Sequence, residues 1–221
     1  MNNNLTELIF ILDRSGSMGG LETDTIGGFN GLIRKQKKEE GEAVVTTVLF
    51  NHTSEVIHDR LPIGEVPEMT EKDYFVAGCT ALLDAVGETV ERVNLIQKHL
   101  REEDRPSKTM MIITTDGFEN ASKRYTHHDV KALIESQKTR GWEFVFLGAN
   151  IDAAEEAGRI GIAPSRAVNY VNDAEGTALN FKVLNKAVGA VRKSRNAKAM
   201  AAVFEDEECF DEIRADYAKR K

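Results

Sequence analysis

Five oxygen-bearing side chains stand at positions where a divalent cation could be held. The stretch DRSGS, residues 13–17, places one carboxylate and two hydroxyls on alternate residues, namely Asp13, Ser15 and Ser17, directly after an apolar run. Alternate side chains of an extended segment point to the same side, so these three can face one ligand. Thr80 in GCTAL and Asp116 in TTDG supply further oxygens. Hard cations such as Mg²⁺ prefer oxygen ligands, and we therefore regard these five residues as candidate metal ligands.

Each short run also has a simpler interpretation. Asp and Ser are common in turns and at helix N-termini, so DRSGS alone is equally compatible with a turn that caps a helix. Asp116 followed by Gly117 is, by itself, typical of a plain turn. The metal-binding interpretation therefore depends on elements that bring Thr80 and Asp116 to the end of the first apolar run.

The hydrophobic pattern predicts such elements. Short apolar or β-branched runs predict strands over residues 5–13, 43–51, 54–61, 108–116, 142–150 and 166–171. Apolar residues at helical spacing predict helices over residues 23–38, 80–100, 126–139, 153–159 and 173–194. This alternation is typical of an α/β fold with a mostly parallel central sheet and helices on both faces. The short NHT link, residues 51–53, predicts an antiparallel hairpin and therefore one antiparallel edge strand.

In open parallel sheets, ligands bind beyond the carboxyl ends of the strands. Asp13 and Asp116 stand at the ends of two predicted strands, and Thr80 stands at the start of a predicted helix. We therefore expect the candidate ligands to meet at one edge of the sheet.

Three motifs in this order resemble the von Willebrand factor A (vWA) family. DRSGS matches the D-x-S-x-S signature of that family, GCTAL resembles its threonine loop, and TTDG resembles its second-aspartate motif. The resemblance covers roughly residues 5–194. It implies a three-layer, Rossmann-like fold with strand order 3-2-1-4-5-6. It also implies a metal-ion-dependent adhesion site (MIDAS) that binds Mg²⁺, with Mn²⁺ or Ca²⁺ as alternatives, through Asp13, Ser15, Ser17, Thr80 and Asp116.

The predicted function is that of an intracellular, stand-alone module that binds an acidic residue of a partner protein through the metal. We expect no enzymatic activity. A metal-dependent phosphatase or other hydrolase is one alternative, but Ser15 stands where a haloacid-dehalogenase-like phosphatase needs a second carboxylate. An accessory subunit of an ATPase complex is another alternative; the sequence has no Walker-type motif, so the ATPase would be a separate chain.

Composition restricts the partners and the location. The 221 residues carry a net charge of −7, which argues against an extended nucleic-acid surface. No apolar run approaches the length of a membrane span. Two distant cysteines and the lack of a basic leader before the first apolar run favour a cytoplasmic protein. We expect residues 1–194 to form the vWA domain and residues 195–221 to be a charged C-terminal tail, helical or partly disordered. The oligomeric state is not predicted.

Overall fold

The computed structural model describes residues 1–205 and 207–221. Its centre is one six-stranded sheet with the strand order β3-β2-β1-β4-β5-β6. All neighbouring strands are parallel except β2 and β3, which form the antiparallel edge hairpin. The strands are β1 (Asn2–Asp13), β2 (Glu42–Phe50), β3 (Ser54–Pro62), β4 (Pro106–Thr115), β5 (Trp142–Gly148) and β6 (Ala167–Asn169). The predicted fold class and strand order are thereby confirmed.

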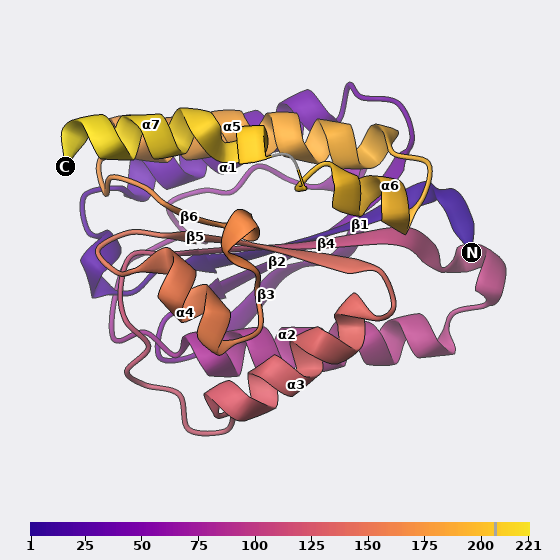
Figure 1. Cartoon of the computed structure of the whole chain (residues 1–221), viewed down its shortest axis with the longest axis horizontal. Coiled ribbons are helices and arrows are strands. Elements are labelled where there is room, and N and C mark those ends of the chain that lie inside the picture. Colours follow the sequence, from indigo (N-terminus) through magenta and orange to yellow (C-terminus); the bar gives the residue numbers. More distant parts are fainter. Residues whose placement is uncertain (206) are drawn as a thin grey trace.

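Helices cover both faces of this sheet (Figure 1). One face carries α1 (Glu22–Gln36), α5 (Ala174–Lys193), α6 (Ala197–Ala202) and α7 (Asp211–Arg220). The other face carries α2 (Leu82–His99), α3 (His127–Lys138) and α4 (Ala153–Arg159). Short 3-10 turns complete the described elements: η1 (Gly16–Met18), η2 (Ile63–Glu65), η3 (Glu102–Asp104), η4 (Pro164–Arg166) and η5 (Glu207–Phe210). Among these described helices, none is both long enough and apolar enough to cross a membrane.

The continuous apolar character of β1 follows from burial on both faces. Leu8, Phe10 and Leu12 point into the core beneath α1 and α5, whereas Ile9 and Ile11 point into the core beneath α2 and α3. Successive residues of a strand point to opposite faces of the sheet. A central strand between two layers of helices therefore needs apolar residues at both its odd and its even positions. This burial on both faces fixes the carboxyl end of β1 in the middle of the sheet.

The C-terminal segment is helical where the structure describes it, and it shares the main core. Met200, Phe204, Phe210 and Ile213 are all buried among the side chains of that core. In this segment the buried apolar residues stand apart from one another among charged residues. For that reason its sequence pattern resembles that of a solvated tail. The predicted division at residue 194 therefore does not coincide with a boundary of the hydrophobic core. The assignment of residues 1–194 to the vWA domain and of residues 195–221 to a tail stays a prediction.

Candidate metal centre at the carboxyl edge of the sheet

The two candidate aspartates lie at the carboxyl ends of neighbouring strands. Asp13 is the last residue of β1, and Asp116 directly follows β4. The two strands are parallel, with Leu12 paired to Thr114, so both chains leave the sheet at the same edge. The order of strands in the sheet thus brings together carboxylates that are separated by about a hundred positions in the sequence.

The Asp13 carboxylate fixes the turn that follows β1. Its Oδ1 accepts a hydrogen bond from the backbone N–H of Ser15 at 2.7 Å, and its Oδ2 accepts one from the Thr115 hydroxyl at 2.6 Å. The Tyr74 hydroxyl donates to the backbone carbonyl of Asp13 at 2.5 Å. The bonds from Ser15 and Thr115 hold the carboxylate in one orientation, and the bond from Tyr74 holds the backbone where the DRSGS turn starts.

Ser15 and Ser17 connect the Asp13 turn to the Asp116 carboxylate. The Oγ atoms of Ser15 and Ser17 lie 3.1 Å apart. Ser17 donates its hydroxyl hydrogen to Asp116 Oδ1 at 2.5 Å, and the Asn172 amide donates to the other oxygen, Oδ2, at 3.0 Å. Four of the five predicted ligands therefore form one connected group.

Thr80 joins this group through the packing of its loop. The Gly16 N–H donates to the Gly78 carbonyl at 2.9 Å, which ties the loop to the DRSGS turn. The Asn120 side chain accepts from the Thr80 N–H at 3.0 Å, and the Thr80 carbonyl accepts from the Asn120 N–H at 3.0 Å. A methyl group placed on Gly117 would lie 3.5 Å from Ser17 Oγ and 3.7 Å from Thr80 Oγ1. The two hydroxyls consequently border the same space, and all five predicted residues come together.

The electrostatics of this group fit a bound cation. Asp13 and Asp116 are each only 1% exposed, and neither has an ion-pair partner among the residues that the structure describes. Burial raises the pKa of both carboxyls, although hydrogen bonds from Thr115 and Ser15 at Asp13, and from Ser17 and Asn172 at Asp116, oppose it. Buried carboxylates without a counter-charge are costly, and a divalent cation would supply that charge. Ser17 is exposed and leaves the group accessible from solvent.

The kind of cation follows from the donor set. Among the described residues, no cluster of three or more His, Cys, Asp or Glu side chains is arranged to hold a metal. The centre instead offers two carboxylates and three neutral hydroxyls, all of them oxygen donors. This set suits a hard divalent cation better than a thiolate- or imidazole-seeking one.

Solved structures with this arrangement of strands and helices come from several organisms. Proximal thread matrix protein 1 from the mussel byssus, in a structure whose MIDAS motif is occupied by zinc, matches at a TM-score of 0.57 and 15% identity over 83% of this chain and 46% of its own. The manganese-loaded TRAP protein of Plasmodium vivax matches with a TM-score of 0.55 and 18% identity. The match covers 82% of this chain and 74% of that protein's chain. The pilus adhesin SpaC of Lactobacillus rhamnosus GG matches with a TM-score of 0.62 and 13% identity. The match covers 84% of this chain and 30% of that protein's chain.

The chain has the vWA fold. It spans less than half the length of the mussel protein. No family model matches the sequence, and no curated protein matches it.

Several residues that the sequence did not single out support the centre of this vWA fold. Tyr74, Thr115 and Asn172 hydrogen-bond directly to Asp13 or Asp116, and each belongs to a different segment of the chain. Only Thr115, inside TTDG, stood within a recognised motif. The Glu119 carboxylate accepts from the Leu83 N–H at 2.9 Å and from the Ser122 N–H at 2.7 Å, so it organises the start of α2.

One histidine lies near the centre in space. His52, in the turn after β2, packs so closely on Gly78 that a methyl group there would overlap the imidazole ring. Within the described part of the chain, the imidazole makes no hydrogen bond to Ser15, Ser17 or Thr80. In the described residues, His52 therefore does not form a hydrogen-bonded serine–histidine pair with these hydroxyls.

Proposed function

We propose that this chain is a divalent-metal-dependent protein-binding module. Asp13, Ser15, Ser17, Thr80 and Asp116 hold a cation, which we propose to be Mg²⁺ with Mn²⁺ or Ca²⁺ as alternatives. When bound, the cation supplies a positive centre that attracts an Asp or Glu carboxylate of a partner protein. The observation that carries this proposal is the pair of buried carboxylates, which lack a positively charged partner among the described residues. They are connected through the Ser15 N–H, which donates to Asp13, and through the hydroxyls of Ser15 and Ser17, the second of which donates to Asp116.

The residues of the chain have distinct tasks in this proposal. Asp13 orients the DRSGS turn through the Ser15 N–H, and Asp116 is held in place by Ser17 and Asn172. The three hydroxyl groups provide oxygen ligands for the cation without adding negative charge. The centre therefore retains attraction for an incoming carboxylate, which a site built from four or five carboxylates would lose.

The surface beside the centre suits a protein partner. Phe118, two residues after Asp116, is 57% exposed, and Phe75, next to Tyr74, is 51% exposed. The described residues have only three other exposed large apolar side chains, Met1, Val56 and Leu95. Aromatic side chains are enriched among the residues that dominate binding energy at protein interfaces. We therefore place Phe75 and Phe118 in the partner-binding surface.

The comparisons are consistent with this proposal without extending to the partner. One solved relative in fold carries manganese, one carries zinc in its MIDAS motif, and one is a pilus adhesin. We further propose that the chain is not an enzyme and that it acts in the cytoplasm. The second proposal is supported by Cys79 and Cys209, which are both free thiols.

The test combines metal binding with partner binding. Mg²⁺ or Mn²⁺ is expected to raise the melting temperature of the wild type by mass action, and Asp13→Asn is expected to abolish the rise. Asp59→Asn, at an exposed ion pair on β3, serves as the control. Partners captured from a lysate on the wild type are expected to elute with chelator and to be absent from Asp13→Asn. A partner that binds equally well in chelator would contradict the proposal. Metal-dependent turnover of a phosphate ester, lost in Asp13→Asn, would instead show an enzyme.

A further inference from the structure

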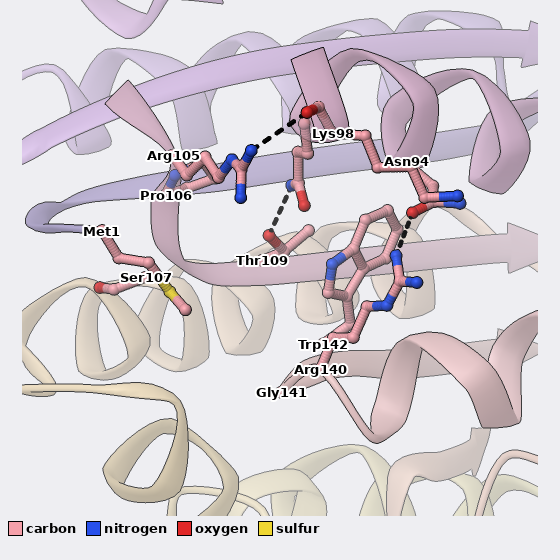
Figure 2. Close-up of a pocket in the computed structure, with 11 residues that line it drawn as sticks. Met1, Asn94, Lys98, Arg105, Pro106, Ser107, Thr109, Arg140, Gly141 and Trp142 are labelled. Atoms are coloured by element: carbon pink, nitrogen blue, oxygen red, sulfur yellow. Dashed lines mark hydrogen bonds between the residues drawn. The ribbon is translucent and has the colours of Figure 1, made fainter. Parts of the chain in front are cut away.

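A cavity of about 400 Å³ lies at the opposite end of the sheet from the candidate metal centre (Figure 2). Its lining includes Pro106, the first residue of β4, and Trp142, the first residue of β5. The candidate centre lies beyond the other end of β4, which has ten residues. Since a strand rises about 3.3 Å per residue, the two places are roughly 30 Å apart. The cavity is therefore separate from the metal centre.

Three cationic side chains line this cavity, and no Asp or Glu among the residues that the structure describes does so. They are Lys98 at the end of α2, Arg105 before β4 and Arg140 after α3. None of the three has an ion-pair partner among the described residues, although the whole chain carries a net charge of −7. Each arginine is held by neutral acceptors. Arg105 donates to the carbonyls of Leu100 at 2.9 Å and Lys98 at 3.0 Å, and Arg140 donates to the Asn94 side chain.

The interior of the cavity adds polar and aromatic groups. Gln97 donates to Thr109 Oγ1 at 3.0 Å and to Glu7 Oε2 at 2.7 Å, and that carboxylate is already paired with Arg60. Figure 2 shows Arg105 on one side of Thr109 and Arg140 with Trp142 on the other. The Ser107 hydroxyl, also in the lining, is buried without a hydrogen-bond partner in the part of the chain that the structure describes.

We propose that this cavity binds a small organic anion that carries a phosphate or carboxylate group on a flat apolar ring. The guanidinium groups of Arg105 and Arg140 provide planar donors for an oxyanion, the group that arginine recognises best. Trp142 is 3% exposed, and the part of its indole that borders the cavity provides an apolar contact for the edge of the ring. The volume falls within the range of sites for small molecules. The unbalanced positive charge of the lining selects the anion over a neutral molecule.

The chain offers a local readout, because Trp142 is its only tryptophan. Its fluorescence can be followed during titration with phenyl phosphate, benzoate, inorganic phosphate and phenol. A saturable change in the Trp142 fluorescence is expected with phenyl phosphate or with benzoate. The one that binds more tightly shows whether the cavity prefers a phosphate or a carboxylate group. Inorganic phosphate, which lacks the ring, and phenol, which lacks the charge, are each expected to bind at least about tenfold more weakly.

Matched variants then locate the binding. Arg105→Gln and Arg140→Gln are each expected to weaken the ring-bearing anion about tenfold, through loss of a charge-assisted hydrogen bond. Arg101→Gln, an exposed arginine of the same region outside the cavity, is expected to change nothing. Binding is expected to persist in chelator and in Asp13→Asn, which separates this proposal from the metal centre.

Three results would overturn the proposal. The first is the absence of a saturable response to both ring-bearing anions in the wild type, which requires no variant to fold. The second is phenol binding as tightly as the anions. The third is unchanged affinity in a folded Arg105→Gln, Arg140→Gln double variant, with folding checked by its melting temperature.

Discussion

The Ser17 hydroxyl donates to Asp116 Oδ1 at 2.5 Å, although the two residues are 99 positions apart in the sequence. The contact joins the turn after β1 to the turn after β4, and these strands are neighbours in the sheet. Ser17 is exposed while Asp116 is buried, so the contact also joins the accessible side of the candidate centre to its interior. Its removal is therefore an informative perturbation.

Ser17→Ala is expected to weaken Mn²⁺ binding by at least about tenfold, because it removes an oxygen donor and frees one side of Asp116. Isothermal titration calorimetry measures the affinity. Ser136→Ala, at an exposed serine of α3, is the control and is expected to bind Mn²⁺ like the wild type. Equal affinities for Ser17→Ala and the wild type would exclude Ser17 from the metal ligands.

Phe118→Ala is expected to separate partner binding from metal binding. The side chain is 57% exposed beside the centre, so its loss is expected to weaken a metal-dependent partner more than about fivefold while leaving Mn²⁺ affinity unchanged. Leu95→Ala removes an equally exposed apolar side chain from α2 and is the matched control. If both variants bind the partner alike, the aromatic surface beside the centre has no role in recognition.

Phe210→Ala tests whether the C-terminal segment is part of the core. Phe210 is fully buried and stacks on Phe204 with ring centroids 6.1 Å apart. Its truncation is expected to lower the free energy of unfolding by about 3–5 kcal/mol, measured by urea denaturation. Phe118→Ala, the same change at an exposed site, is expected to cost less than about 1 kcal/mol. Similar losses in the two variants would mean that the segment does not stabilise the fold.

Asp84 gives a pH-dependent prediction. Burial alone would raise the pKa of this carboxyl, but the backbone N–H groups of Lys123, Tyr125 and Arg124 donate to it at 2.9–3.0 Å and lower the pKa below 3.8. A depressed acid pKa stabilises the folded state above the unfolded value, and this stabilisation is lost as the pH falls below it.

Asp84→Asn is accordingly expected to lower the free energy of unfolding at pH 7 by about 1–3 kcal/mol, because the amide cannot accept all three bonds. The difference from the wild type is expected to shrink as the pH falls below about 3.8. Urea unfolding of both proteins at the two pH values measures this. The control Asp59→Asn alters only an exposed ion pair with Arg92 and is expected to show little difference at either pH. A constant difference between wild type and Asp84→Asn would show that the ionised carboxylate is not the stabilising group.

Local sequence pattern was sufficient to predict the elements that carry the candidate centre. The apolar run before Asp13 is continuous because β1 is buried on both faces, and such a run marks a central strand. The apolar run before the TTDG motif likewise marks a buried strand, and the motif stands where that strand, β4, ends. Since the carboxyl ends of parallel strands meet at one edge, the meeting of Asp13 and Asp116 could be predicted once the sheet was assumed. The five residues were candidate metal ligands because all of them carry oxygen donors, and the family resemblance added the expectation that they form a MIDAS. Their assignment as metal ligands stays a prediction.

The sequence by itself determined the alternation of strands and helices and the oxygen-bearing residues at the strand ends, because both are repeated or local features. Only the tertiary structure decided that Tyr74 and Asn172 support the aspartates, and that Phe204 and Phe210 belong to the core. Likewise, only the fold places Arg105, Arg140 and Trp142 around one cavity. These are contacts between single residues on segments that are remote in the sequence. The packing of whole helices and strands determines which of these residues meet, and that packing leaves no periodic pattern in the sequence.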